Sequence, residues 1–503
     1  MKTRILNSIR RPVFALLLMG LMALAVWRAF GQGEGVAKRL PGEGGKLSVL
    51  DFGAIGNGIA DDTQAIQKAI NSKAATIDFP AGTYRLTKTI TINLDEVGFT
   101  SLTADGTAQI VMAAAGPAFR FVGTHGGTAD PESAQANVWQ KQRMPQVTGL
   151  AISGEHAEAD GIEAAGTMQL TVSGVHLRAL RHGIHLVERN RNVLITGCHI
   201  YHNRGCGIYL DHVNLHQTNI VGSHISYNGG GGVVVRGGEV RNVHITGCDI
   251  EANQAADGPP TANVLFDSTD GSMAEAAIVG CTIQHSRPAP QSANIRILGK
   301  GIFPHQGKPQ EFHCGHVTIG DNVLSDVQTN IHLSGARGVT IVGNTLWQGY
   351  EHNLLVEDSH QIVLGANMME RNPLYGYTDE AKNRVHFHKC SDCTIQGLHL
   401  HQVQQSPAGI TLEECRRMHL TGCSILDCDN VGVRLVNVTQ SRIADNLIRD
   451  DRGNEPASIP LQVQGGYGNV ILNNLLLGKP DIDPASGSVR DNDEGRADVP
   501  GSK

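Results

Sequence analysis

Three side chains of the sequence have the types and spacing that acid–base chemistry needs. Glu357, His388 and Glu413 each end a short run in which apolar residues alternate with others, as in Gly409-Ile-Thr-Leu-Glu413. If these runs lie on three neighbouring parallel strands, the two glutamates are two strands apart, about 9.6 Å between backbones. That separation suits a general acid and a general base on either side of a water molecule, as in an inverting glycosidase.

The histidine between the two acids leaves a second chemistry open. A cationic His388 would lower the pKa of both neighbouring carboxyl groups and so remove the general acid. A neutral His388 could instead be the base that takes a proton beside a uronate carboxylate, which is the chemistry of a lyase or an epimerase. His332, His386 and Arg434 are expected nearby on the adjacent column of outward side chains, where they could contact a substrate.

A second group of polar residues lies at the outward positions of the corresponding strands in earlier coils. It comprises Tyr209, Asp211, Arg236 and Asp267. An arginine between two acids holds both ionised, which suits binding of a substrate carboxylate, or a structural role, better than acid catalysis. For both groups the alternative is a solvated surface, since opposite charges on a strand ladder stabilise stacking by roughly a few tenths of a kcal/mol per pair.

An internal repeat must position these side chains. The unit Ile-Thr-Gly-Cys-x-Ile appears as Leu194-Ile-Thr-Gly-Cys-His-Ile200, His244-Ile-Thr-Gly-Cys-Asp-Ile250 and His419-Leu-Thr-Gly-Cys-Ser-Ile425. Its glycine or an equivalent stands at Gly149, Gly174, Gly197, Gly222, Gly247, Gly280, Gly320, Gly343, Gly365, Gly397, Gly422, Asp445 and Asn473. Most steps are 22 to 25 residues long, and the longer ones indicate inserted loops.

About ten residues after most of these glycines comes a second run, such as Gly207-Ile-Tyr-Leu-Asp211. Its apolar residues recur with period 2, which is typical of a strand with one inward and one outward face. Two or three short strands per turn, joined by Gly and Asn bends, predict an all-β parallel β-helix of about 13 coils. In such a solenoid, residues some two dozen apart in sequence become vertical neighbours.

The ten cysteines all fall between Cys198 and Cys428. Cys390 and Cys415 each precede their coil's glycine by seven residues, so they should be stacked neighbours at a separation that a disulfide tolerates. A reduced ladder inside the solenoid is the favoured alternative, because several cysteines stand at interior positions. These are Cys198, Cys248, Cys281 and Cys423.

Composition excludes several classes of function. The chain has 503 residues, 41 basic against 48 acidic side chains and a formal charge of -7, which leaves no basic excess for binding nucleic acid. Its 60 glycines against 11 Phe, 8 Tyr and 3 Trp favour a β-rich chain that turns often. Cys390-Ser-Asp-Cys393 has no second pair at zinc-like spacing, and no Asp-rich loop supports calcium, so no cofactor is predicted.

The first residues have the pattern of an export signal. Lys2, Arg4, Arg10 and Arg11 precede an apolar run from Val13 to Trp27, which is short for a membrane span. We expect a signal peptide over residues 1–31, or alternatively an uncleaved N-terminal anchor, and hence a secreted, periplasmic or cell-surface protein. A flexible lead-in over 32–46, a single β-helix domain over 47–478 and a disordered tail over 479–503 complete the predicted organisation.

The opening of the predicted domain carries a distinctive motif. Ser48-Val-Leu-Asp-Phe-Gly-Ala-Ile-Gly-Asn-Gly-Ile-Ala-Asp-Asp-Thr-Gln-Ala-Ile-Gln-Lys-Ala-Ile70 is followed by Ile77-Asp-Phe-Pro-Ala-Gly-Thr-Tyr84. It resembles the N-terminal segment of the pectate-lyase-like superfamily, which includes rhamnogalacturonase-like hydrolases, mannuronan C5-epimerases and phage tailspikes. The resemblance extends over about residues 48 to 475. It implies a right-handed β-helix with a short N-terminal capping helix, and a polysaccharide along the outer face of the Gly-Ile-x-Leu strands.

The sequence departs from the catalytic signatures of this superfamily. The residues before Gly183 and Gly207 are His182 and Cys206, so the polygalacturonase-like Asn-x-Asp is missing, and Tyr209-Leu210-Asp211 replaces the Asp-Pro-His of the epimerases. The resemblance and the group of Glu357, His388 and Glu413 lead us to predict a glycoside hydrolase or polysaccharide lyase acting on a uronate-containing or neutral glycan, whereas the missing signatures favour the alternative. The alternative is a non-catalytic carbohydrate-binding or cell-surface structural protein. The sequence leaves the oligomeric state open.

Overall fold

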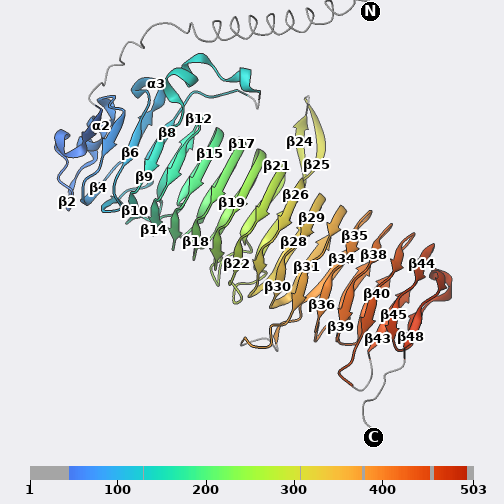
Figure 1. The fold of residues 1–503 in the computed structure, drawn as a ribbon. Coiled ribbons are helices and arrows are strands. Elements are labelled where there is room, and N and C mark those ends of the chain that lie inside the picture. The colour runs from blue at the N-terminus through green and yellow to red at the C-terminus, as the bar shows by residue number, and fades with distance from the viewer. Residues whose placement is uncertain (1–44, 128–129, 306, 376–379, 454–457, 496–503) are drawn as a thin grey trace, which may run out of the picture. The chain divides into compact units, whose positions relative to one another are not determined.

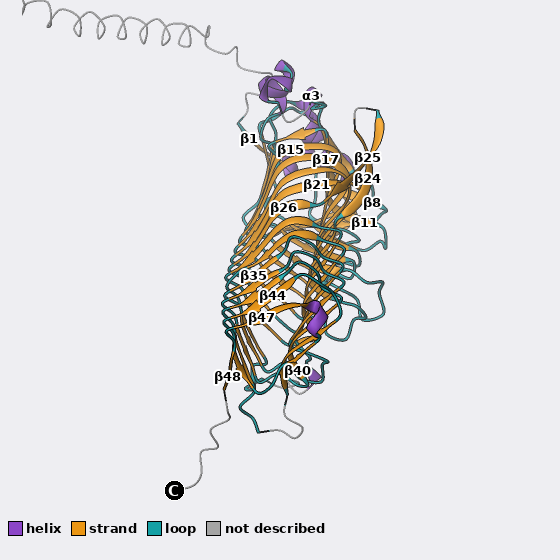
Figure 2. Ribbon diagram, turned by 90° about the vertical axis from the view of Figure 1, so that its right-hand side faces the viewer, coloured by secondary structure: helices purple, strands orange, loops and turns teal. Residues whose placement is uncertain are grey.

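Residues 45–495 wind as a right-handed parallel β-helix in the computed structural model, which describes all of them except 128–129, 306, 376–379 and 454–457. The strands of each coil pair in parallel with those of the next, and successive coils lie one above another (Figures 1 and 2). The predicted fold class is confirmed. The predicted signal peptide and most of the lead-in fall within residues 1–44, outside the described part of the chain.

Each coil contributes strands to three stacks. The first stack contains β5 (Ile90–Asn93), β8 (Gly116–Val122), β11 (Ala159–Ala165), the beginnings of β15 (Ile184–Thr196), β17 (Cys206–Val221), β19 (Gly231–Thr246) and β21 (Ala262–Val279), and then β23 (Ala293–Leu298), β28 (Val327–Ser334), β31 (Gly349–Glu357), β34 (Arg384–His388), β37 (Ile410–Glu413), β40 (Val431–Val436), β43 (Ile459–Gln464) and β46 (Asp481–Ile482).

The second stack contains β1 (Lys46–Ser48), β3 (Thr76–Asp78), β6 (Ser101–Thr103), β9 (Gln146–Thr148), β13 (Thr171–Ser173), the ends of β15, β17, β19 and β21, and then β26 (Gly315–Gly320), β29 (Arg337–Val342), β32 (His360–Leu364), β35 (Thr394–Gln396), β38 (His419–Thr421), β41 (Arg442–Ala444), β44 (Asn469–Leu472) and β47 (Gly487–Arg490). The short β12 (Thr167–Met168) pairs with the middle of β15.

The third stack contains β2 (Asn57–Asp61), β4 (Gly82–Leu86), β7 (Ala108–Met112), β10 (Ala151–Gly154), β14 (His176–Arg178), β16 (His199–Tyr201), β18 (His224–Ser226), β20 (Asp249–Glu251), β22 (Thr282–Gln284), β27 (Val323–Leu324), β30 (Thr345–Trp347), β33 (Met368–Glu370), β36 (His399–His401), β39 (Ser424–Leu426), β42 (Leu447–Arg449), β45 (Leu475–Leu477) and β48 (Asp493–Gly495).

The repeated glycine marks the turn between the second and third stacks. Each of the 13 repeat positions is followed by one third-stack strand, from β10 to β45, so the predicted coils are all present among the described residues. The third stack has three further strands before them and one after. Gly197, with φ 60°, and Asp445, with φ 61°, show why the position favours glycine or a small polar residue, since the turn requires the left-handed region.

Amide ladders run through the interior beside the hydrophobic core. The residue after the turn accepts hydrogen bonds from the preceding coil, as where the Asn322 backbone N–H and Nδ2 donate to Asn344 Oδ1 across 3.0 and 2.9 Å. Asn344 donates in turn to Asn367 Oδ1 across 2.9 Å. Buried backbone and amide groups are thereby satisfied from one coil to the next. The repeat pattern of the sequence does not by itself predict these ladders.

The cysteines lie inside the solenoid. All ten are buried and carry free thiols, and Cys198, Cys248, Cys281 and Cys423 belong to the core as predicted. The stacking of Cys390 and Cys415 is also confirmed, because the residue after Cys415, Arg416, donates its backbone N–H to Cys390 O across 2.9 Å. The structure therefore has the reduced ladder and not the disulfide.

A short helix packs on the first coils, as the resemblance implied. In α2 (Thr63–Asn71), Ile66, Ala69 and Ile70 are buried in the core at the N-terminal end of the solenoid. Covering the first coil in this way protects its hydrophobic interior and strand edges from solvent. The remaining helical segments are short: η1 (Val49–Phe52), α3 (Leu94–Val97), η2 (Pro131–Ser133), η3 (Val138–Gln142) and η5 (Pro484–Ser486).

The predicted disordered tail begins too early. Residues 481–495 form β46, β47 and β48, which pair in parallel with β43, β44 and β45 and so add a last coil. The reason is that the exposed edge of the preceding coil offers backbone groups to any following segment, whatever its apolar content. Only residues 496–503 of this segment lie outside the described part.

One excursion interrupts the parallel pairing. β24 (Lys300–His305) and β25 (Lys308–His313) form an antiparallel hairpin that projects beside the solenoid in Figure 1. It enters between β23 and β26 without disturbing their neighbours' register. Across the described residues, no helix has both the length and the apolar character needed to cross a bilayer.

Candidate functional site

The first stack presents two columns of outward side chains, in the register that the sequence predicts. One column pairs in the order His185, Tyr209, Val234, Leu265, Arg296, His332, Leu355, His386, Thr411, Arg434 and Gln462. The other pairs in the order Val187, Asp211, Arg236, Asp267, Leu298, Ser334, Glu357, His388, Glu413, Val436 and Gln464. The residues named as site candidates therefore share one face.

Glu357, His388 and Glu413 end three successive strands, β31, β34 and β37, and directly follow one another in their column. Their side chains are 36%, 28% and 39% exposed, so a substrate on this face can reach all three. Glu357 and Glu413 flank His388 in this column, so their backbones are about two strand spacings apart.

Each of these carboxylates is held by a histidine of the neighbouring column. His332 Nε2 lies 3.0 Å from Glu357 Oε2, and His386 Nε2 lies 3.2 Å from Glu413 Oε2. Burial lowers the pKa of His332 and of His386, and burial together with Arg384 lowers that of the adjacent His352 to about 3. These imidazoles are therefore neutral near pH 7 and can hold the carboxylates in place without adding positive charge.

Arg434 occupies the strand after the glutamate pair. It stands in the same column as His386, two strands farther on, and donates from Nη2 to Gln464 Oε1 across 3.0 Å. Its guanidinium supplies positive charge one strand beyond Glu413. This position is compatible with the predicted contact to an acidic substrate.

His388 and Glu413 also approach Glu414, which the sequence analysis did not single out. One possible ligand atom from each of the three lies within 4.8 Å of the others. Glu414 adopts a left-handed backbone with φ 52° at the corner after β37. The side chains of both consecutive glutamates therefore lie on the same side of the coil. The signal for it was present in the sequence as Glu413-Glu414 at a strand end.

The second predicted group comes together differently from the expectation. Arg236 Nε lies 3.6 Å from Asp267 Oδ2, but Asp211 receives its hydrogen bonds from histidines: His212 Nδ1 lies 2.7 Å and His185 Nε2 3.1 Å from its oxygens. Burial acts to raise the pKa of Asp211, yet hydrogen bonds from His212, His185 and Tyr209 outweigh it and lower the pKa. The arginine thus pairs with one acid of the two.

Tyr209 completes this group as a hydrogen-bond donor. Its ring stacks on His185 with centroids 5.3 Å apart and planes 3° from parallel. Burial, and then the charge of Asp211, raises the pKa of the Tyr209 phenol. The hydroxyl therefore stays protonated and donates a hydrogen bond to Asp211. The arrangement orients Asp211 toward the outer face.

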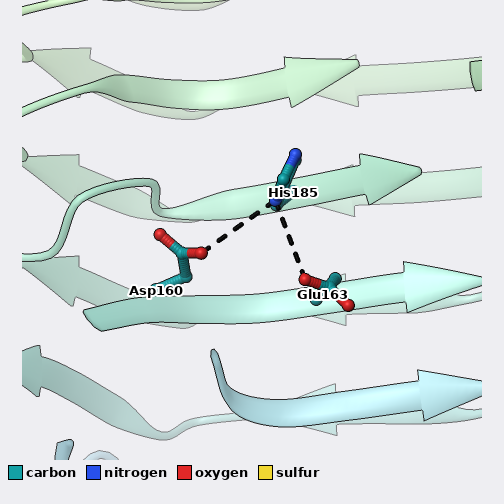
Figure 3. A group of neighbouring side chains, drawn as sticks. All are labelled: Asp160, Glu163 and His185. Atoms are coloured by element: carbon teal, nitrogen blue, oxygen red, sulfur yellow. Dashed lines mark ion pairs between the residues drawn. The ribbon is translucent and has the colours of Figure 1, made fainter. Parts of the chain in front are cut away.

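A buried polar network extends the same columns toward the N-terminus, and the sequence analysis missed it. Figure 3 shows His185 between Asp160 and Glu163, with Nδ1 at 4.0 Å from Asp160 Oδ2 and 3.8 Å from Glu163 Oε2. Glu163 pairs in register with His185 one coil earlier, so extending the predicted column by one strand would have found it. Asp160 lies near the start of the same strand, β11, directly before Gly161-Ile162.

The charges of this network are already matched within the chain. Asp160 is fully buried and accepts from Arg181 Nε across 2.9 Å and from the His182 backbone N–H across 3.0 Å. Glu163 Oε1 accepts from Arg120 Nε across 2.6 Å. The network therefore stabilises the coils, and its carboxylates are less available to a ligand than Glu357 and Glu413.

Two family models match parts of the chain. One is described as "Right handed beta helix region" and matches residues 140–283, and the other is described as "Periplasmic copper-binding protein (NosD)" and matches residues 300–478. No curated protein matches the chain. Both matched segments fall within the solenoid described above.

The second description raises the question of a copper site. Within the described residues of 300–478, the group with converging donors is His388, Glu413 and Glu414, which offers one nitrogen and two oxygens. These donors fit a divalent ion such as Cu²⁺, but they equally fit other divalent ions. The thiols of this segment are buried inside the coils, so no thiolate ligand is available at the surface of its described residues.

One solved structure with a TM-score above 0.5 supports the architecture, and two others are similar at lower scores. A double mutant of the tailspike protein of E. coli bacteriophage HK620, in complex with a pentasaccharide, is 13% identical with a TM-score of 0.52, over 85% of this chain and 80% of that one. The A-module of mannuronan C-5 epimerase AlgE6 from Azotobacter vinelandii is 15% identical with a TM-score of 0.41, over 89% of this chain and 99% of that one. Tailspike protein 3 of bacteriophage CBA120 is 12% identical with a TM-score of 0.42, and the match covers 91% of this chain but only 62% of that one.

The parallel pairing of every coil, the glycine-marked turn and these comparisons agree with the resemblance of the opening motif. The chain therefore has the right-handed parallel β-helix fold.

Proposed function

We propose that this protein binds a polysaccharide along the outer face of the first stack and hydrolyses it between Glu357 and Glu413. The observation that carries the proposal is the register, which aligns Glu357, His388 and Glu413 on three successive strands with both carboxylates exposed. Two strand spacings, about 9.6 Å between backbones, are compatible with a water molecule beside the scissile bond, as inversion requires.

In this proposal one glutamate protonates the departing glycosidic oxygen and the other takes a proton from the attacking water. His332 and His386 act as positioning residues, because each lies within hydrogen-bonding distance of one carboxylate and both stay neutral. His388 lies between the acids and would contact the sugar at the point of cleavage. Arg434 would face an acidic group of the next sugar.

The second column of this face continues toward the N-terminus and would hold more of the polymer, whereas Val234, Leu265 and Arg296 of the first column are buried. Arg236, 46% exposed, lies four strands from Glu357 in the same column, about 19 Å away. With Tyr209, Asp211 and Asp267 it forms a second contact region for an extended chain. The relatives support a polysaccharide ligand in their printed descriptions, which name a pentasaccharide and mannuronan.

The proposal also places the protein outside the cytoplasm. The basic and apolar pattern of residues 1–27 and the word periplasmic in the description of the family model over 300–478 support export. Fractionation of expressing cells, with and without residues 1–31, would test it. Retention of the full chain in the cytoplasm would contradict this part of the proposal.

The central experiment measures reducing ends released from a panel of neutral and uronate-containing polysaccharides. Glu357→Gln and Glu413→Gln should each lower the rate by about 10²-fold or more, because each removes one partner of the acid–base pair. Glu275→Gln, which changes an exposed glutamate on a different part of the coil, is the matched control and should keep full activity. Circular dichroism would verify that all variants stay folded.

The products distinguish the remaining reactions. A lyase yields unsaturated sugars that absorb in the near ultraviolet, and that result would move the base to His388 and contradict hydrolysis. Binding without any product would show a carbohydrate-binding protein. Activity that persists in both glutamine variants would disprove the assignment of these residues.

A further inference from the structure

A hollow with aromatic walls lies on the third stack, away from the columns described above. It spans β16, β18 and β20 and has a volume of about 460 Å³. The register explains it: Tyr201, Ser226 and Glu251 are vertical neighbours, so a small side chain stands between two large ones. We call it the Tyr227 hollow after the ring at its corner.

The walls of the hollow are held by hydrogen bonds. The Tyr201 hydroxyl lies 3.1 Å from His224 Nδ1, and His224 Nε2 lies 3.2 Å from Asp249 Oδ2. These contacts fix the three side chains before any ligand arrives. Preorganised polar groups lose little conformational freedom on binding, which favours affinity.

An exposed aromatic platform borders the hollow. Tyr227 is 50% exposed, and its ring stacks on His202 of the preceding coil with centroids 5.0 Å apart and planes 11° from parallel. Both residues occupy the left-handed corner after their strand, with φ 59° and 51°.

A second hollow lies on the preceding coils of the same stack. It spans β7, β10 and β14, has a volume of about 370 Å³ and includes the exposed Arg178, so we call it the Arg178 hollow. Its residue His176 contacts Tyr201 of the Tyr227 hollow, with ring centroids 6.3 Å apart. The middle strands of the two hollows, β10 and β18, are three coils apart, about 14 Å.

We propose that this face of the third stack is a glycan-binding groove that takes a neutral oligosaccharide extended over both hollows. Stacked aromatic rings offer an apolar face for the C–H surface of a sugar, while Asp249 and Glu251 accept hydrogen bonds from hydroxyl groups. The groove is separate from the site proposed on the first stack and does not depend on it.

The charges of the two hollows select the class of glycan. Asp249 and Glu251 line the Tyr227 hollow, and among the described residues that line it there is no lysine or arginine to balance them. A polyuronate would therefore be repelled there. A cationic polymer would meet Arg178 in the other hollow, so a ligand that spans both is neutral.

Isothermal titration of the full-length protein with laminarihexaose, cellohexaose and hexa-N-acetylchitohexaose tests the inference. At least one of these neutral hexasaccharides should bind, and Tyr227→Ala should weaken it by about tenfold through loss of the stacking surface. Tyr467→Ala is the matched control, because Tyr467 is 62% exposed but lies among the last coils, and it should bind as the unchanged protein does.

Two further probes decide between ligands. Hexamannuronate binding, if present, should be unaffected by Tyr227→Ala, since that ligand would use the first stack. Choline, a cation of the kind that binds to aromatic rings, should not bind. The inference is overturned if no neutral hexasaccharide binds, if the bound one is indifferent to Tyr227→Ala, or if choline binds and loses affinity with that variant.

Discussion

The guanidinium of Arg296 donates from Nε to Nδ1 of His332 across 3.1 Å. A guanidinium can only donate, so Nδ1 must be the acceptor and the proton of the neutral ring must sit on Nε2. That proton points to Glu357 Oε2, 3.0 Å away. A buried arginine therefore fixes the tautomer of the imidazole that holds one proposed catalytic carboxylate.

Replacing Arg296 should allow the His332 ring to adopt either neutral tautomer. Arg296→Met removes a neighbouring positive charge that, with burial, lowers the pKa of His332, so we expect that pKa to rise. Imidazole nitrogen shifts in labelled protein would report both the pKa and the tautomer, with His332→Gln identifying the signal. An unchanged pKa would show that Arg296 does not control the ring.

The same substitution also leaves acceptors without a donor. Arg296 donates to Thr261 O across 2.7 Å and to Gln291 O across 2.5 Å. Loss of these bonds should lower the free energy of unfolding by about 1 to 3 kcal/mol in denaturant titration. Activity must therefore be compared well below the midpoint of unfolding.

The interior amide ladder should be a large source of stability. Asn344→Leu removes the acceptor of Asn322 and the donor to Asn367 and should lower the free energy of unfolding by about 3 kcal/mol. Asn344→Ser should cost about 1 kcal/mol, because Ser223 stands at the equivalent position and accepts the Cys198 backbone N–H. Equal losses for the two variants in urea titration would mean that ladder hydrogen bonds are not the cause.

One arginine provides a comparison of buried and exposed ion pairs. Arg181 pairs with Asp160, which is fully buried, and with Glu158, whose side chain is 57% exposed. Asp160→Asn removes the buried charge that pairs with Arg181 and weakens its hydrogen bonds, and it should cost about 1 to 3 kcal/mol because Arg181 itself is 36% exposed. Glu158→Gln should cost less than about 1 kcal/mol, since water screens that pair. Thermal unfolding of the two variants measures the difference, and similar values would refute the buried role of Asp160.

Two histidines should give stability opposite dependences on pH. His125 is buried, and burial with nearby Arg189 and Arg191 lowers its pKa to about 4. The unfolded chain then binds more protons, so its contribution is complete above pH 6.5 and is lost between about pH 6.5 and 4, at up to about 1.4 kcal/mol per pH unit. His125→Phe should remove this acid sensitivity.

His212 has the reverse sign. Hydrogen bonds to Asp211 and Asp270 raise its pKa, so its stabilising effect is complete below pH 6.5 and is lost as pH rises through the raised value. His212→Gln should therefore destabilise the protein in acid and leave it unchanged in alkali. Urea midpoints measured across this range check both variants, and parallel pH profiles would contradict the assignment.

The thiols should be unreactive until the protein unfolds. Burial raises the pKa of Cys206, Cys314 and Cys428 to about 12. These thiols are therefore shielded from reagents, and few of them are present as the reactive thiolate. Without reductant, iodoacetamide should modify none of the ten cysteines in native protein and all ten after denaturation. Eight modified residues would reveal a disulfide, and Cys390→Ser would identify it as the Cys390–Cys415 pair.

The sequence was sufficient to predict the coil register and both outward columns. Gly409-Ile-Thr-Leu-Glu413 shows why: period 2 decides which side chains face out, and the glycine-marked turn fixes where each coil starts. Stacking then follows, because a one-residue slip would turn the apolar set outward. Glu357, His388 and Glu413 became neighbours on this basis alone.

Other features depend on side-chain conformation and on backbone edges. The pairing of Asp211 with His185 and His212, in place of Arg236, is a choice among rotamers that spacing does not encode. The last coil, β46 to β48, has little apolar periodicity and forms on the edge left by β43 to β45. Burial of Asp160 likewise depends on Arg181, one coil away.

The β24–β25 hairpin enters between two strands of the first and second stacks while the flanking coils keep their pairing. Variation in loop length is thus decoupled from the rest of the architecture. Genetic recombination could exchange such inserted hairpins and change which ligands the surface binds, with little change in the free energy of unfolding. The scaffold would then acquire new specificities faster than a domain whose loops share one packed interior.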